Sequence, residues 1–170
     1  MLRSEVDQQL KRIDELVAEI DSNVPVTSGY QSVKLRADLA GLLVVAIAAT
    51  YENCVKEALY SYAGRQHPAF EGYARRRYAK INSRIAVSDL KSYCDLLEPS
   101  LKAGFQAKLS ERKKAIAERT GANIESMYAQ LLDWRHEFAH TGARNTTLEE
   151  ASRAHLFAKR VIYVFADVLH

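Results

Sequence analysis

One stretch of the chain gathers residue types that could do chemistry, the ten residues DWRHEFAHTG at 133–142. Starting from His136, it gives H-E-x-x-H, in which two histidines on one side of a helix bind zinc and Glu137 is the general base. Starting from Arg135, it gives R-H-x-x-x-H, an arginine and a histidine that can act on a phosphodiester without a metal ion. His140 is therefore a metal ligand in one interpretation and a general acid or base in the other.

The zinc interpretation lacks a third protein ligand, which a catalytic zinc requires. Only thirty residues follow His140; Glu149 and Glu150 come too soon after it, and Asp167 lies deep in the last predicted helix. Arg135 would also place a guanidinium beside the dication, which is electrostatically unfavourable. Zinc peptidases bind substrate along a sheet edge, and the sequence predicts no sheet. We therefore favour the metal-free interpretation and expect no cofactor.

The composition is that of an ordinary globular protein. The chain has 170 residues, 48% of them hydrophobic and 26% charged, and we expect a single domain over 1–170. A formal net charge of +3 permits an anionic partner without requiring one. Cys54 and Cys94 lack a metal-binding spacing, and free cysteines of this kind predict a reduced, cytoplasmic protein.

The most apolar segment, Leu39–Ala49, is too short to span a membrane. Asp38 and Glu52 bound it, whereas a transmembrane helix needs about 20 apolar residues. We expect it to be a buried helix in the middle of a bundle, with no membrane partner. No signal peptide is recognisable, since the first twenty-one residues carry charges throughout.

Apolar spacing and helix caps predict helix after helix, with few proline or glycine breaks. We expect a first helix from Leu2 to Ile20, a loop at Ser22–Tyr30, and a central helix from about Ser32 to Ala63 that Gly64 and the Pro68 region stop. Short helices should begin at Ala69, near Ser88 and after Pro99. A further helix lies between Asn123 and Gly142, and the last helix runs from the capping box Thr147-x-x-Glu150 to Leu169. The fold class predicted is an all-α, up-and-down bundle of four main helices with a small helical insertion.

The setting of the Arg135–His140 pair resembles that in a known superfamily. The pair ends the penultimate predicted helix, just before a glycine turn and a final apolar helix. Upstream, AIAATYENCVKEAL at 46–59 carries an aromatic–glutamate pair, Tyr51 and Glu52. Both features resemble the HEPN superfamily, in particular its RiboL-PSP and stand-alone toxin-like branches, whose nucleases carry R-[polar]-x(3–5)-H at this place.

The resemblance implies a metal-independent endoribonuclease that leaves 2′,3′-cyclic phosphate ends. Arg135 would hold the phosphate, His140 would be the catalytic acid or base, and His136 would orient the site. Glu52 would either orient Arg135 or lie at a polar rim. HEPN nucleases generally work as homodimers with two motifs in one cleft. The resemblance also implies a toxin or phage-defence effector, with an antitoxin or another defence-system protein as a partner.

Four points of the sequence stay open. Arg135 and His140 are five residues apart, about 140° around a helix, so they converge only if the arginine reaches round or the helix end turns. Basic runs, with tyrosines beside the first, are candidate RNA contacts or plain solvated faces; they comprise Arg75, Arg76, Arg77, Lys113 and Lys114. His140 could instead serve as a cationic C-terminal cap, although its setting favours the catalytic role. The alternative function is a catalytically silent HEPN-like module that binds a partner protein or a nucleotide.

Overall fold

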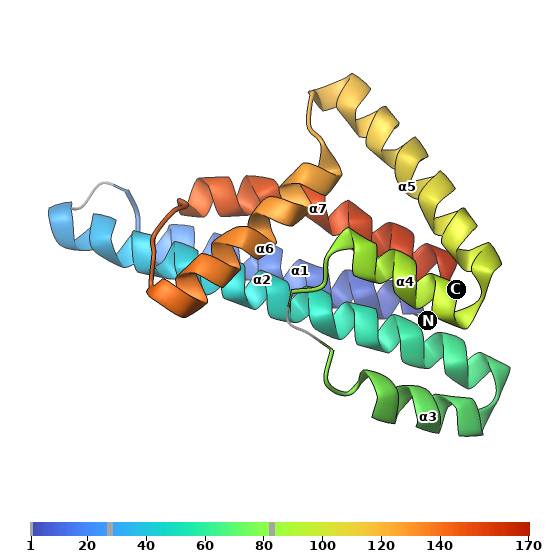
Figure 1. The fold of residues 1–170 in the computed structure, drawn as a ribbon. Coiled ribbons are helices and arrows are strands. Elements are labelled where there is room, and N and C mark those ends of the chain that lie inside the picture. Colours follow the sequence, from blue (N-terminus) through green and yellow to red (C-terminus); the bar gives the residue numbers. More distant parts are fainter. Residues whose placement is uncertain (1, 27–28, 82–83) are drawn as a thin grey trace.

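The computed structural model describes residues 2–26, 29–81 and 84–170, and within these ranges every regular element is a helix (Figure 1). The all-α prediction is confirmed. In chain order the helices are α1 (Leu2–Asn23), α2 (Gly29–Gln66), α3 (Pro68–Tyr78), α4 (Val87–Leu97), α5 (Pro99–Thr120), α6 (Ile124–Thr141) and α7 (Leu148–Val168).

Two long helices, α2 and α7, form the centre of the arrangement. α2 has 38 residues, which corresponds to a length of about 57 Å, and it packs against α1, α3, α6 and α7. α7 packs against α1, α2, α5 and α6. The first turns of α2 extend beyond the other helices (Figure 1), and Tyr30 and Val33 are exposed there.

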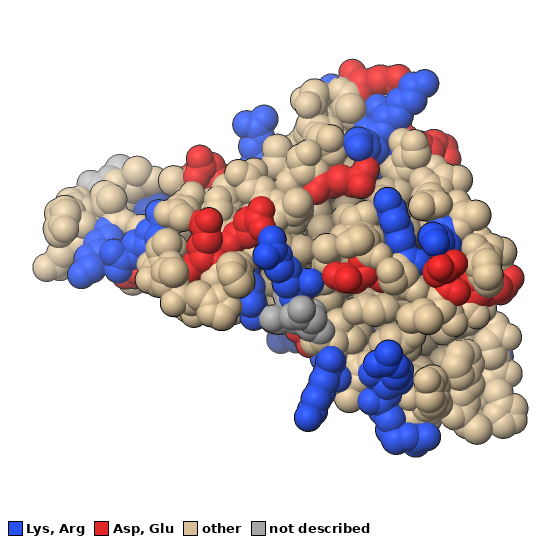
Figure 2. Space-filling view, in the orientation of Figure 1, with Lys and Arg blue, Asp and Glu red and all other residues tan. Residues whose placement is uncertain are grey.

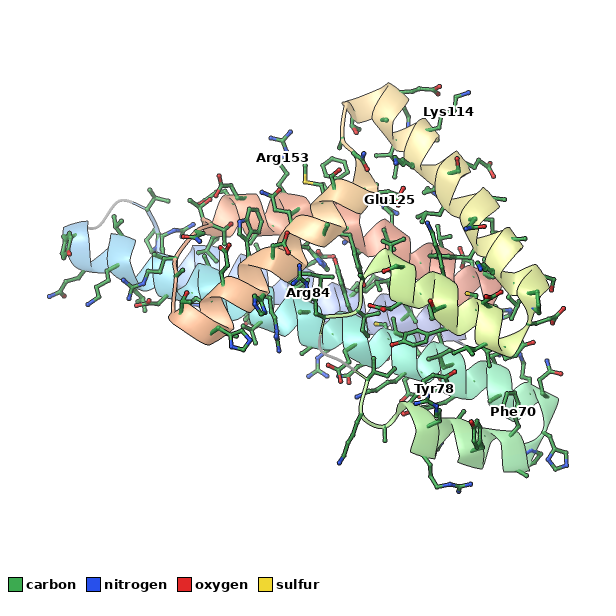
Figure 3. All side chains as sticks on the ribbon, in the orientation of Figure 1. Phe70, Tyr78, Arg84, Lys114, Glu125 and Arg153 are labelled. Carbon is green, nitrogen blue, oxygen red and sulfur yellow. The ribbon has the colours of Figure 1, made fainter. Side chains whose placement is uncertain are left out.

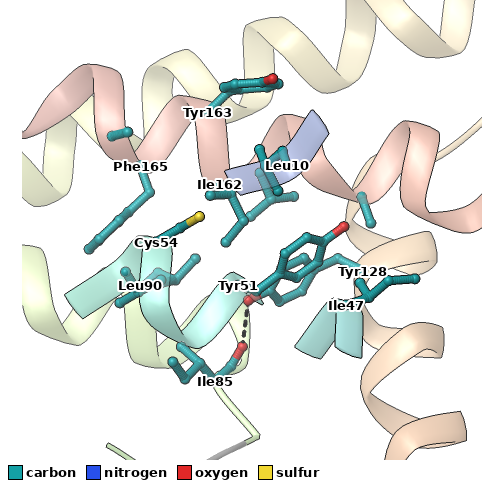
Figure 4. Close-up of a cluster of buried hydrophobic side chains, with 14 of the residues drawn as sticks. Leu10, Ile47, Tyr51, Cys54, Ile85, Leu90, Tyr128, Ile162, Tyr163 and Phe165 are labelled. Carbon is teal, nitrogen blue, oxygen red and sulfur yellow. Dashed lines mark hydrogen bonds between the residues drawn. The ribbon is translucent and has the colours of Figure 1, made fainter. Parts of the chain in front are cut away.

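Buried aromatic side chains join these helices (Figure 4). Tyr51 of α2 and Tyr128 of α6 stack with ring centroids 5.5 Å apart and an angle of 2° between the planes. The Tyr128 hydroxyl donates a hydrogen bond of 2.8 Å to the carbonyl of Ile85, which fixes the segment before α4. Phe105 of α5 meets Phe165 of α7 edge-on at 5.9 Å. Close packing of this kind gives α6, the helix with the candidate motif, a fixed position.

The central helix is longer than predicted at both ends. α2 includes Gly64, which was expected to stop it. A Cβ at Gly64 would lie 2.8 Å from a carboxylate oxygen of Glu71, so the glycine here makes room for the first turn of α3. The break falls instead at His67, whose ring accepts a hydrogen bond from the backbone of α3. Of the predicted loop Ser22–Tyr30, residues 27 and 28 lie outside the described ranges.

The prediction of four main helices is only roughly correct, because α5 is a fifth long helix of 22 residues. Pro99 occupies its first turn as expected, but the helix continues to Thr120. Its sequence is rich in charged residues and its buried residues are sparse, so no continuous apolar stripe indicates its length. Those residues are Phe105, Leu109 and Ile116.

The segment Leu39–Ala49 is buried on one side only. Its inward face packs into the core, but Leu42 is 57% exposed and Leu35, one heptad earlier, is 48% exposed. α2 therefore presents an uncovered apolar stripe on the side away from the bundle. Across the described ranges, no helix is both long and apolar enough to cross a membrane.

Candidate functional site at the end of α6

The last two turns of α6 carry the candidate motif, and the helix is fixed at both ends. The side chain of Asn123 accepts hydrogen bonds from the backbone N–H groups of Glu125 and Ser126. Gly142 adopts a left-handed conformation, φ 69°, and its N–H donates to the carbonyl of Phe138. Both caps match the sequence prediction. The helix is continuous to Thr141, so its end does not turn before His140.

Phe138 determines which side of α6 faces α2. A Cβ placed on Gly41 would lie 2.0 Å from the Phe138 ring, so this ring lies directly on the α2 backbone. By helix geometry, His136 and His140 are each about half a turn around α6 from Phe138, whereas Arg135 is about 60° from it. Accordingly, both histidines are exposed and Arg135 is half-buried.

The two histidines of the motif lie side by side. The ring centroids of His136 and His140 are 4.4 Å apart, and their planes are inclined at 57°. In the part of the chain that the structure describes, neither ring makes a hydrogen bond or an ion pair with another residue. Two uncommitted imidazoles are thus available to accept or donate protons, or to contact a bound anion.

Arg135 also lacks a protein partner. Among the described residues, no hydrogen bond, ion pair or aromatic contact involves its guanidinium. Glu52, the predicted orienting residue, is half-buried in α2 and forms an ion pair of 2.5 Å with Lys56 one turn later. A half-buried guanidinium without a carboxylate can bind a phosphate without first breaking an ion pair.

Glu137 is held by the loop that follows α6. It is exposed, and its carboxylate accepts a hydrogen bond from the side-chain amide of Asn145. Over the described ranges, no group of three or more His, Cys, Asp or Glu side chains has an arrangement that could hold a metal ion. Cys54 and Cys94 are buried, and burial raises the pKa of each thiol to about 12, so neither is a reactive thiolate at neutral pH.

The arginines of α3 fall into two kinds. Arg75 is committed to the fold: it pairs with Glu71 at 2.8 Å and lies over the ring of Tyr60. Arg76 and Arg77 are exposed and have no ion pair within the described residues. Figure 2 shows basic side chains over α3 and the connection after it.

The tyrosines beside these arginines differ in the same way. Tyr73 is 53% exposed and stacks on Phe70, with centroids 6.3 Å apart. Tyr78 is buried and packs edge-on against Tyr93 (Figure 3 labels Phe70 and Tyr78). Only the first pair is accessible to a base.

Lys113 and Lys114 lie on α5, on the wall of a hollow of about 380 Å³ that Lys91 and Glu125 also line. Lys113 forms a 2.9 Å ion pair with Glu125, whereas Lys114 is mostly exposed and 4.0 Å from Glu118. Figure 3 shows Lys114 near the far end of α5. The two lysines are therefore on a different helix from the histidine pair, and the structure does not bring them into one cluster with it.

Sequence reasoning missed a buried polar cluster around His155. Its Nδ1 is 2.9 Å from the Tyr51 hydroxyl, and its Nε2 has no hydrogen-bond partner but lies 3.6 Å from Asp14. Asp14 is instead bound by Lys159 at 2.8 Å. Burial and the charge of Lys159 lower the pKa of His155 to about 4. One signal in the sequence could have indicated this burial. His155 is four residues after Ala151 and three before Ala158, so it lies on the apolar face of α7 with them.

A known family matches nearly the whole chain. The sequence model of the RiboL-PSP-HEPN family matches residues 8–170. The chain therefore belongs to the RiboL-PSP-HEPN family, an all-α family within the HEPN group, and the suspected relationship is confirmed. HEPN domains are often ribonucleases and commonly bind RNA and dimerise. No curated protein and no solved structure matches the chain significantly.

Proposed function

We propose that the protein is a metal-independent endoribonuclease whose reactive groups are Arg135 and His140. The observation that carries this proposal is the exposed end of α6, where two adjacent imidazoles and an arginine without a carboxylate partner lie within six consecutive residues. Family membership supports it, because HEPN domains are often ribonucleases.

The chemistry requires two proton transfers and one positive charge. A base removes the 2′-hydroxyl proton, and the 2′-oxygen attacks the adjacent phosphorus. The bond from phosphorus to the 5′-oxygen breaks, and an acid protonates that oxygen. The products are a 2′,3′-cyclic phosphate and a 5′-hydroxyl. His140 supplies one of the proton transfers, Arg135 stabilises the charge on the pentavalent phosphate, and His136 orients its neighbouring ring.

A second copy of the chain completes the site. Because α6 is continuous to Thr141, Arg135 and His140 of one copy stay about 140° apart around the helix. The uncovered stripe of α2, which contains Leu35 and Leu42, offers an apolar surface for a symmetric dimer. Dimerisation through this stripe brings a second copy of the motif to the site, and the His140 of that copy carries out the other proton transfer.

The mechanism is tested by the ends of the products. RNA incubated with pure protein in EDTA should yield 2′,3′-cyclic phosphate ends, and a substrate with a single 2′-deoxy nucleotide at the cleaved position should resist cleavage there. Loss of cleavage in EDTA and its return with zinc would contradict the proposal. Binding of RNA or of a partner protein without any cleavage would favour the silent-module alternative.

The dimer is tested separately by Leu42→Glu, with Ala107→Glu as a control at an exposed position of α5. Sedimentation should show a dimer for the native protein and the control, and a monomer for Leu42→Glu, because a buried carboxylate destabilises an apolar interface. Cleavage should fall together with the dimer. A native protein that is fully active as a monomer would remove the two-copy site.

A toxin or phage-defence role, with an antitoxin or another defence-system protein as a partner, is the biological setting that we propose for this activity. It rests on the relationship to HEPN proteins. Expression of the native protein should arrest growth, and expression of His140→Ala at the same level should not.

A further inference from the structure

A hollow between α5 and α7 lies outside the motif of α6. The two helices touch where α5 begins and α7 ends, with Gly104 next to Val168 and Phe105 against Phe165. From there α5 diverges from α7 towards its own C-terminal end (Figure 1). The hollow has a volume of about 590 Å³ and is lined by Ile116, Thr120, Leu156, Phe157, Arg112, Arg119 and Arg160.

The charge of this hollow is positive and uncompensated. Its walls carry Arg112, Arg119 and Arg160 and no carboxylate, and none of the three arginines forms an ion pair within the described residues. Arg119 donates only to the carbonyl of Ala115 in its own helix, and Arg160 lies 5.9 Å from the ring of Tyr163. Three guanidinium groups around one hollow repel one another unless an anion lies between them.

Two acidic side chains line a neighbouring hollow and not this one. Glu111 and Asp167 line a neighbouring hollow that shares only Arg112 with this one. Asp167 is already bound by Arg3. Neither carboxylate therefore lines the hollow beside Arg119 and Arg160.

Apart from Thr120, the other side chains that line the hollow are apolar. Leu156 is 49% exposed, although it lies on the best-packed helix of the fold, and Phe157 beside it is half-buried. Ile116 on α5 is buried behind them. An exposed leucine next to an aromatic ring offers a flat surface on which a planar base can lie.

This combination fits a nucleotide better than a peptide. Arginine forks bind phosphate oxygens in pairs, and the volume lies within the range of about 300–1,000 Å³ of small-molecule sites. The carboxylates of an acidic peptide are spaced at about 3.3 Å per residue along an extended chain, so few of them can enter one compact hollow. A nucleotide brings clustered phosphate charge and a planar base together.

We propose that the hollow between α5 and α7 binds a nucleotide unit, with its phosphate on Arg119 and Arg160 and its base against Leu156 and Phe157. The unit is either a free nucleotide or one nucleotide of a single-stranded nucleic acid. This binding does not require that the protein cleave RNA, so its test and the test of the ribonuclease activity can fail independently.

Two probes separate the two sources of the nucleotide. Fluorescence anisotropy would measure binding of labelled ATP and of a short labelled 2′-deoxy oligonucleotide, which lacks the 2′-hydroxyl and is not cleaved. Comparable affinity for both supports a free nucleotide, and binding of the oligonucleotide alone supports a nucleic-acid strand. Absence of binding to both probes overturns the proposal.

Charge reversal locates the site. The double variant Arg119→Glu/Arg160→Glu should bind the preferred probe at least about tenfold more weakly, because two phosphate contacts become repulsions. The matched control Arg12→Glu/Lys34→Glu makes the same change in net charge at exposed positions of α1 and α2, and it should bind like the native protein. Equal losses in the two variants would show attraction by overall charge and would overturn the proposal.

The apolar contact is tested by Leu156→Ser. This variant should weaken binding of the probe without changing the dependence of binding on salt, because it removes a base contact and leaves the phosphate contacts intact. Displacement of the probe by polyglutamate as effectively as by unlabelled nucleotide would show that the hollow selects negative charge alone. Thermal unfolding of each variant verifies that it is folded.

Discussion

The two exposed histidines of α6 and the buried histidine of α7 have the same side chain in opposite surroundings. His136 and His140 face solvent and have no protein partner in the described residues. His155 is 1% exposed, bonded to Tyr51 through one nitrogen and unsatisfied at the other. The exposed rings of α6 can contact a ligand directly, whereas burial keeps the ring of His155 neutral. The comparison shows that burial and partners, more than residue type, decide whether a histidine serves chemistry or folding.

The largest expected effect separates these two histidine environments. His140→Ala should slow RNA cleavage by about 10²–10⁴-fold, which is typical for the loss of one general acid or base. Its melting temperature should match that of the native protein because the side chain is exposed. His155→Gln should behave in the opposite way, with a lower melting temperature and normal cleavage per folded molecule. Cleavage assays and calorimetry on both variants would measure this, and a reversed pattern would remove the distinction.

The second prediction concerns pH and the fold. The pKa of His155 is about 4 in the folded protein and near 6.5 when the chain is unfolded, so between these values the unfolded chain binds the extra proton. The contribution of His155 to the free energy of unfolding is therefore fully present above pH 6.5 and is lost as the pH falls to 4. The difference corresponds to about 3 kcal/mol. Urea unfolding at several pH values should show this slope, and His155→Gln should flatten it between pH 4 and 6.5. If the slope were the same in His155→Gln as in the native protein, other titrating groups would be its cause.

The contact between Phe138 and Gly41 predicts a moderate loss of both stability and cleavage, because it fixes the position of the motif on α6. Gly41→Ala would force the Phe138 ring off α2, and overpacking of this kind costs about 1–3 kcal/mol. Both stability and cleavage should decrease, because the same ring sets the position of the end of α6. Gly104→Ala is the control, since its Cβ would make an ordinary contact of 3.9 Å with Val168. Equal stability of the two variants would show that α6 adjusts freely.

The smallest effect is expected at Glu52. Its ion pair with Lys56 is of the i,i+4 kind, which contributes about 0.3–0.5 kcal/mol. Glu52→Gln should therefore leave the melting temperature and the rate of cleavage nearly unchanged. A loss of cleavage as large as that in Arg135→Ala would show that Glu52 turns to the arginine when RNA is bound, the orienting role that its sequence position suggests.

Local signals made most of the helices predictable. Asn123, Gly142 and the capping box at Thr147 were assigned correctly because caps depend on residues within one turn. Gly64 was misjudged because a contact with Glu71 of the next helix, rather than a turn, explains that glycine. The length of α5 was missed because its buried residues are too widely spaced to form a stripe.

The place of the candidate motif in the fold was predictable, whereas the contacts of its neighbouring side chains were less so. The motif at 135–140 stands in consecutive sequence, so its place at the end of a helix followed from the caps. The pairing of Glu52 with Lys56 depends on side-chain orientation, which the sequence pattern does not determine. The contact of His155 with Tyr51 joins residues 104 positions apart, and such a contact requires the packing of whole helices.

The central claim is that α6 acts through Arg135 and His140 and not through a zinc ion with Glu137 as the base. The most direct measurement compares RNA cleavage by Arg135→Ala and Glu137→Gln in buffer without a chelator, with thermal unfolding as the check on folding. We expect Arg135→Ala to lose about 10²–10³-fold in rate and Glu137→Gln, which loses only a carboxylate facing Asn145, to keep most of the activity. An inactive Glu137→Gln beside an active Arg135→Ala would contradict the account.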